Sequence, residues 1–85
     1  MKVLIPSPLR SYSGNSWVEA TGATLGDVLA DLDRQYPGIR FRMVDEQDRL
    51  RPHMRVFVAG RAIHDLGYAF APADELHIVQ ALSGG

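Results

Sequence analysis

Apolar and polar residues alternate over several short runs of the chain, and a period of two is typical of strands with one buried face. Four such runs lie at residues 2–6, 16–21, 54–59 and 75–80, and a short return strand after a glycine lies at residues 61–63. The Ser-Gly-Asn sequence at 13–15 is a turn composition. We therefore expect the first two runs to pair as a hairpin.

One segment, from Thr24 to Tyr36, follows the helical period instead. Its apolar residues share one helical face: Leu25, Val28, Leu29, Leu32 and Tyr36. Thr24 can cap the first turn, with Asp27 as the reciprocal acid, and Pro37-Gly38 ends the helix. Residues 39–53 show neither period, so we expect an irregular or short-helical connection there.

The predicted order is strand, strand, helix, strand, short strand, strand. Two hairpin-like halves flanking one helix indicate the α+β class and a β-grasp fold, a mixed sheet of four to five strands with one main helix packed on one face. We expect residues 1–80 to form this domain. Residues 81–85 are expected to form a flexible tail, because glycine loses much entropy on ordering and no partner strand follows.

The last strand separates two kinds of residue by its period of two. Leu76 and Ile78 should face the helix, whereas His77 and Val79 should face outward. Arg55 and Phe57 of the strong strand at 54–59 are candidates for the same outward face. An apolar patch on an open sheet face is a suitable docking surface, so these four outward residues are our candidates for partner docking.

Composition and charge restrict the function. The chain has 85 residues, a formal net charge of −1 and no cysteine. The length suits one small domain, and the missing thiols exclude disulfides and a cysteine nucleophile. A charge near zero gives no overall attraction to nucleic acid or to an anionic membrane. The apolar run at residues 3–5 is too short for a signal peptide or a membrane span, so we expect a cytoplasmic protein without nucleic-acid or membrane partners.

The polar side chains form no familiar catalytic or metal-binding motif. The three histidines lack helical pairing and accompanying cysteines, so we assign no metal. Five arginines are mixed with acids between residues 40 and 55, and we interpret them as a solvated mixed-charge face: Arg40, Arg42, Arg49, Arg51 and Arg55. Trp17 is expected to pack in the core or within the hairpin.

The ending Ala-Leu-Ser-Gly-Gly carries the candidate chemistry. Five extended residues span roughly 17 Å, enough to reach into a pocket of another protein. Gly84 lacks a Cβ and suits a narrow channel, while Ser83 and Leu82 supply reach. We therefore nominate the α-carboxylate of Gly85 as the reactive group.

The final ten residues, LHIVQALSGG, align without a gap on the ubiquitin ending LHLVLRLRGG. More broadly, the chain resembles the MoaD/ThiS family of small ubiquitin-like sulfur carriers. The resemblance covers essentially the whole chain: the opening strand, the ATLGDVLADL helix, the RPHMRVFVAGR strand and turn, and the APADELHIVQALSGG ending.

The resemblance implies a carrier or co-substrate rather than an enzyme, with no bound cofactor of its own. A ThiF/MoeB-like adenylating enzyme would use ATP and Mg²⁺ to activate the Gly85 carboxylate. A sulfur donor, such as a persulfide-bearing sulfurtransferase, would convert it to a thiocarboxylate. A sulfur-accepting synthase would then use the sulfur in molybdopterin, thiazole or cysteine formation.

Two alternatives from other classes stay open. A ubiquitin-like modifier would join Gly85 to lysine amines, although Ala81 stands where ubiquitin has an arginine used by its activating enzymes. If the chain is a non-reactive β-grasp interaction domain, its last residues take part in no reaction.

Overall fold

The computed structural model describes residues 1–81, which form five strands and four short or medium helices. In chain order the elements are β1 (Lys2–Leu4), η1 (Ser7–Leu9), α1 (Arg10–Ser13), β2 (Trp17–Glu19), α2 (Leu25–Gln35), α3 (Ile39–Met43), β3 (Met54–Val58), β4 (Arg61–Ala62) and β5 (Leu76–Gln80).

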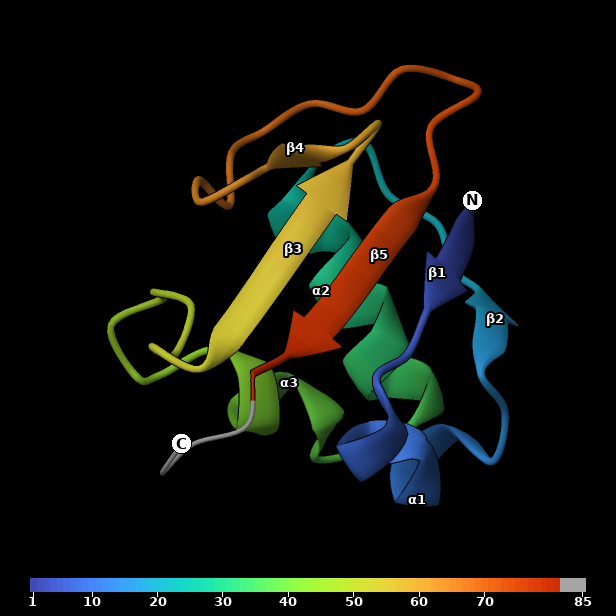
Figure 1. The fold of residues 1–85 in the computed structure, drawn as a ribbon, viewed down its shortest axis with the longest axis vertical. Coiled ribbons are helices and arrows are strands. Elements are labelled where there is room, and N and C mark those ends of the chain that lie inside the picture. The colour runs from blue at the N-terminus through green and yellow to red at the C-terminus, as the bar shows by residue number, and fades with distance from the viewer. Residues whose placement is uncertain (82–85) are drawn as a thin grey trace.

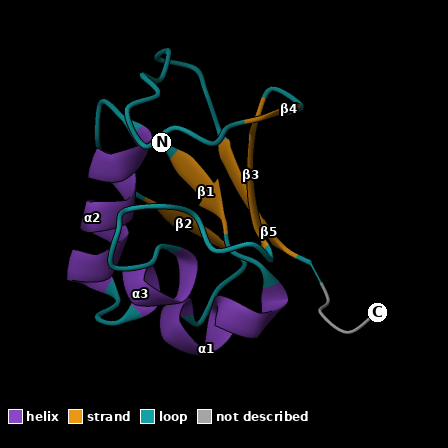
Figure 2. Ribbon diagram, turned by 90° about the vertical axis from the view of Figure 1, so that its left-hand side faces the viewer, coloured by secondary structure: helices purple, strands orange, loops and turns teal. Residues whose placement is uncertain are grey.

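The strands form one mixed sheet in the order β2-β1-β5-β3-β4 (Figure 1). β5 is central: it runs parallel to β1 on one side and antiparallel to β3 on the other. The helices lie on one face of this sheet (Figure 2). This arrangement confirms the predicted β-grasp fold with its mixed sheet and one main helix.

The long helix α2 forms where the sequence predicted it. The Thr24 hydroxyl accepts a hydrogen bond from the Asp27 backbone N–H at 3.2 Å, which caps the first turn. Four apolar residues of α2 are buried against the sheet: Leu25, Val28, Leu29 and Leu32. From β5, Leu76 and Ile78 enter the same core with 0% and 2% of their surface exposed. The inward and outward faces of the last strand are therefore those predicted.

The predicted hairpin of the first two strands is present, but its connection is helical. β1 and β2 pair antiparallel from Lys2↔Glu19 to Leu4↔Trp17. Between them the chain forms η1 and α1 rather than a simple turn, because Pro8 suits the first turn of a helix and Leu9 is buried in the core. Gly14 ends α1 with a φ of 73°, a left-handed conformation that suits glycine.

The connection from α2 to β3 contains one short helix. An irregular or a short-helical connection was expected here, and the second is present. Ile39 and Met43 of α3 are buried, and an isolated bridge joins Val44 to Leu50. This arrangement places the arginine-rich segment beside the end of β5 at which the chain leaves the sheet (Figure 1). After β3, Ala59 and Gly60 both have positive φ and turn the chain into the short return β4, as predicted.

Asp31 links α2 to the chain that enters it. Its carboxylate accepts hydrogen bonds from the Thr21 backbone N–H at 3.0 Å, from Nη2 of Arg34 at 2.6 Å and from the Gln35 amide at 2.9 Å. The Arg34 hydrogen bond, with that of Thr21 next, lowers the pKa of Asp31, while burial opposes the shift. The charged form of this carboxylate thus stabilises the folded state.

We expect the variant Asp31→Asn to lose part of the acid sensitivity of folding. Because the folded-state pKa is lowered, the contribution of Asp31 is complete above its ordinary pKa of 3.8 and disappears as the pH falls through the lower folded-state value. The urea midpoint, measured against pH, should fall less steeply below about pH 4 in the variant.

The matched control is Glu46→Gln, an exposed acid without a side-chain hydrogen bond to any described residue. Its urea midpoint should fall below about pH 4 as steeply as that of the wild-type chain. If the urea midpoint of Asp31→Asn fell below about pH 4 as steeply as that of wild type, the assigned role of Asp31 would be contradicted.

Candidate functional site

The face of the sheet opposite α2, here called the outward face, carries a row of neighbouring side chains from every strand. Strand register places Phe57 beside His77, His77 beside Leu4 and Leu4 beside Trp17. Ala62 extends the row beyond Phe57 on β4. A second, shorter row consists of Arg55 and Val79, nearer to the end of β5.

The four residues predicted to share this face therefore do so. Phe57 and His77 are register partners, as are Arg55 and Val79. Val79 is 42% exposed, His77 and Arg55 are exposed, and Phe57 is half-buried. The structure thus brings the predicted docking residues together in two adjacent cross-strand pairs.

Trp17 belongs to the same surface: of its two expected positions, the core is wrong, and the residue lies in the hairpin, where it pairs with Leu4. Its side chain is 45% exposed, and its ring meets the His77 imidazole edge to face at 5.6 Å between centroids. The contact spans β1, because Trp17 comes from β2 and His77 from β5. The period of two could have predicted this position. Val18 faces the core, so its neighbour Trp17 faces outward.

A charged group borders the apolar row at the start of β5. Nε2 of His77 lies 3.7 Å from a carboxylate oxygen of Glu75, a pair that is ionic only when the imidazole is protonated. Both side chains are about half exposed, so water screens this pair. The outward face therefore combines an apolar centre with a polar border, the usual anatomy of a docking surface.

Beyond β5 the described chain continues for one residue. Gln80 pairs with Met54, and the Ala81 backbone N–H donates to the His53 carbonyl at 2.8 Å. The predicted tail residues Leu82, Ser83, Gly84 and Gly85 lie outside the described residues. The described chain therefore leaves the sheet from the end of its central strand.

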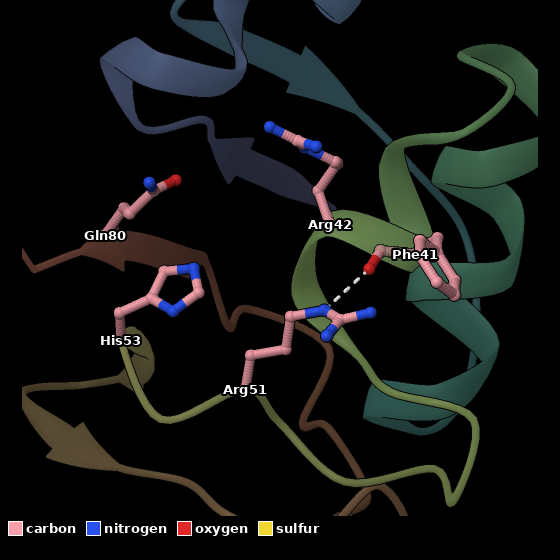
Figure 3. Close-up of a pocket in the computed structure, with 5 residues that line it drawn as sticks. All are labelled: Phe41, Arg42, Arg51, His53 and Gln80. Atoms are coloured by element: carbon pink, nitrogen blue, oxygen red, sulfur yellow. Dashed lines mark hydrogen bonds between the residues drawn. The ribbon is translucent and has the colours of Figure 1, made fainter. Parts of the chain in front are cut away.

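A pocket of about 300 Å³ lies beside this exit (Figure 3). Its lining comes from three segments of the chain: Phe41, Arg42, Arg51, His53 and Gln80. Nε of Arg51 donates to the Phe41 carbonyl at 2.8 Å, and the guanidinium lies over the Phe41 ring at 4.6 Å from its centroid. The two contacts hold Arg51 at the wall of the pocket. Sequence patterns did not reveal this pocket, because its lining residues are far apart along the chain.

The turn after α3 carries the acids nearest in sequence to the pocket residues. Asp45 accepts backbone hydrogen bonds from Gln47 at 2.8 Å and from Arg49 at 3.1 Å. The Arg49 N–H, followed by that of Gln47, lowers the pKa of Asp45. This acid therefore stays charged and stabilises the turn at neutral pH.

Within residues 1–81, no three histidine, aspartate or glutamate side chains are grouped so that they could hold a metal ion. None of the described helices has the length and apolar character needed to cross a membrane.

The sequence model of the ThiS family matches residues 3–85 of the chain. The sulfur carrier protein CysO of Mycobacterium tuberculosis is 34% identical, over 98% of this chain and 96% of CysO. Small archaeal modifier protein 3 of Haloferax volcanii is 32% identical, over 81% of this chain and 77% of that protein. A chain in the crystal structure of the Amycolatopsis orientalis BexX/CysO complex superimposes with a TM-score of 0.90 at 32% identity, covering 99% and 98% of the two chains.

The contact between His77 and Trp17 gives a prediction for the free protein. We expect His77→Ala to shift the fluorescence maximum of Trp17, the single tryptophan, to longer wavelength, because the indole loses a neighbour and gains water contact. The free energy of unfolding should change by less than about 0.5 kcal/mol, as for other exposed positions.

His64→Ala is the matched control, since His64 is exposed and lies in the loop after β4. It should leave the emission spectrum unchanged. An unshifted spectrum in His77→Ala would show that the two rings do not form this contact in solution.

Proposed function

The chain belongs to the ThiS family, and we propose on that premise that it is a sulfur carrier charged at the Gly85 carboxylate. The observation that carries the proposal is the family match through residue 85, which includes the diglycine. The near end-to-end likeness to CysO supports it independently of the fold. In this role the chain is a co-substrate of partner enzymes and not itself a catalyst.

The proposed chemistry begins with adenylation by a ThiF/MoeB-like enzyme that uses ATP and Mg²⁺. A Gly85 carboxylate oxygen attacks the α-phosphorus of ATP and pyrophosphate leaves, which forms an acyl adenylate. Sulfide then attacks the acyl carbon and displaces AMP, leaving a thiocarboxylate. If a persulfide is the donor, an acyl disulfide forms first, and attack by a thiol on its outer sulfur releases the thiocarboxylate and a disulfide.

The central position of β5 suits such a carrier. β1 pairs with the start of β5, β3 pairs with β5 as far as Gln80, and Ala81 is still hydrogen-bonded to His53. A partner that binds the rigid sheet therefore receives the ending from a defined point. Such preorganisation reduces the conformational entropy lost on binding.

We further propose that the outward face docks the partner enzymes. Trp17 and Val79 are among the exposed large hydrophobic residues of the described chain, and large aromatic residues are typical anchors of protein interfaces. The likeness to a chain of the BexX/CysO complex supports binding to a partner enzyme. Sulfur-accepting synthases and the adenylating enzyme would meet the same surface at different times.

The first test is sulfur loading. We expect the chain, incubated with ATP, Mg²⁺, a sulfur source and an adenylating enzyme of its own organism, to gain about 16 Da, the difference between sulfur and oxygen. A chain with one alanine appended after Gly85 should gain nothing, because the carboxylate moves out of register. Full cellular function of that extended chain would favour an idle interaction domain and contradict the proposal.

The second test concerns docking. We expect Val79→Asp to lower kcat/KM for adenylation about tenfold, since a charge would be desolvated in an apolar contact. Most of the loss should appear in KM, because the Gly85 carboxylate itself is unchanged.

Ala30→Asp adds the same charge on the exposed side of α2, away from the outward face, and should leave kcat/KM within about twofold of wild type. Equal effects of the two substitutions would exclude the outward face as the docking surface.

A second candidate function rests on the likeness to small archaeal modifier protein 3. A modifier would use the same activated carboxylate but transfer it to a lysine amine, forming an isopeptide bond. Tryptic peptides bearing a Gly-Gly remnant on lysine, recovered from cells with the wild-type chain and absent without Gly85, would establish this activity.

A further inference from the structure

The pocket at the end of β5 carries positive charge that nearby acids offset only in part: Asp45 acts on Arg51 through space, without an ion pair. Arg40 pairs with Asp48 at 3.0 Å, and Arg49 approaches Asp45 at 4.0 Å. The other three arginines of this region form no ion pair with a described residue: Arg42, Arg51 and Arg55. The mixed-charge interpretation of this segment therefore holds for Arg40 and Arg49, which form ion pairs, and in part for Arg51, which interacts with Asp45 through space.

Two of these unpaired arginines line the pocket together with His53, and no carboxylate of residues 1–81 lines it. Arg51 is held in place by its bond to the Phe41 carbonyl and by the Phe41 ring. The guanidinium of Arg42 is exposed and makes no hydrogen bond to a described residue. Guanidinium groups are strong donors to carboxylates, and the fixed position of Arg51 reduces the entropy lost when it binds one.

The pocket and the outward face lie on opposite sides of the departing chain. Val79 faces outward and is 42% exposed, whereas the next residue, Gln80, lines the pocket on the helix side (Figure 3). Residue alternation in β5 produces this division. A protein that encloses the chain beyond Ala81 therefore meets the outward face, with Val79 and Arg55, on one side and a cationic pocket on the other.

We propose that this pocket docks an acidic segment of the partner protein that receives the ending, an inference that rests on the proposed carrier function. Carboxylate side chains of the partner would bind Arg42 and Arg51, while apolar atoms beside them contact Phe41, which is 59% exposed. The apolar outward face would hold the complex together. The cationic pocket would accelerate association and orient the ending.

A peptide fits this pocket better than a nucleic acid does. Single-stranded nucleic acids stack successive bases on several aromatic side chains, whereas among residues 1–81 the lining offers two rings, those of Phe41 and His53, and Arg51 already covers the Phe41 ring. Glu46, an exposed acid of the adjacent turn, would repel a phosphate backbone that extends beyond the pocket.

Peptide binding to the isotope-labelled full chain tests the pocket without any partner enzyme. The probe is a short capped peptide of alternating glutamate and leucine. It should shift the amide resonances of Phe41, Arg42, His53 and Gln80, and the shifts should weaken at high salt. Arg42→Glu should abolish them, whereas Arg61→Glu, at an exposed arginine on β4, should preserve them.

Two results would overturn the proposal. One is that the peptide shifts only resonances outside the pocket, or shifts none. The other is a single-stranded oligonucleotide or ATP that shifts the pocket resonances while the peptide does not.

Association kinetics with the adenylating enzyme separate this inference from the proposed function. Arg42→Glu should lower the association rate constant about tenfold at low salt and flatten its salt dependence, with little change in dissociation. Unchanged association, with normal sulfur loading, would overturn the acidic-segment inference and leave the carrier function intact. Absence of sulfur loading, with peptide binding at the pocket retained, would overturn the carrier function alone.

Discussion

The pairing of β5 with a strand on each side is the interaction on which the rest of the structure depends. β5 is bonded to β1 and to β3, so the last strand of the chain lies in the middle of the sheet. Its inward residues Leu76 and Ile78 are buried in the core beneath α2. Burial of two large aliphatic side chains contributes roughly 3–6 kcal/mol, so release of β5 would remove much of the stability of so small a domain.

The same alternation that fills the core gives the two sides of β5 different chemistry. On the outward side, His77 lies between the apolar residues Leu4 and Phe57, and the exposed Val79 lies beside Arg55. On the helix side, Gln80 adjoins a pocket lined by arginines and a histidine. Nonpolar contact chiefly lowers dissociation rates, whereas charge chiefly raises association rates. A carrier that must meet several enzymes in succession benefits from rapid, selective encounters and moderate affinity.

Much of the architecture was predictable because local sequence and tertiary environment agree. The helix has its cap at Thr24 and an apolar face, and the structure retains both. Strands with a period of two kept their predicted faces, which explains why Arg55, Phe57, His77 and Val79 were found together. Of the two positions expected for Trp17, the core was wrong, because the preference for burying a large aromatic residue was given more weight than the period of two. The helical connection after β1 was missed because a turn composition at 13–15 does not reveal that Leu9 reaches the core.

Periodicity and the diglycine ending are local features of the chain, so the residues alone predicted the class of fold, the two faces of the last strand and the family. Only the tertiary structure decided which strands are neighbours, and hence that Trp17 meets His77 across β1. It also decided which arginines form ion pairs with acids and which form none with residues 1–81 at the exit of the chain. Charge pairing and surface patches depend on distances in space. Residues far apart along the chain come close to one another only when β1 and β3 pair with β5.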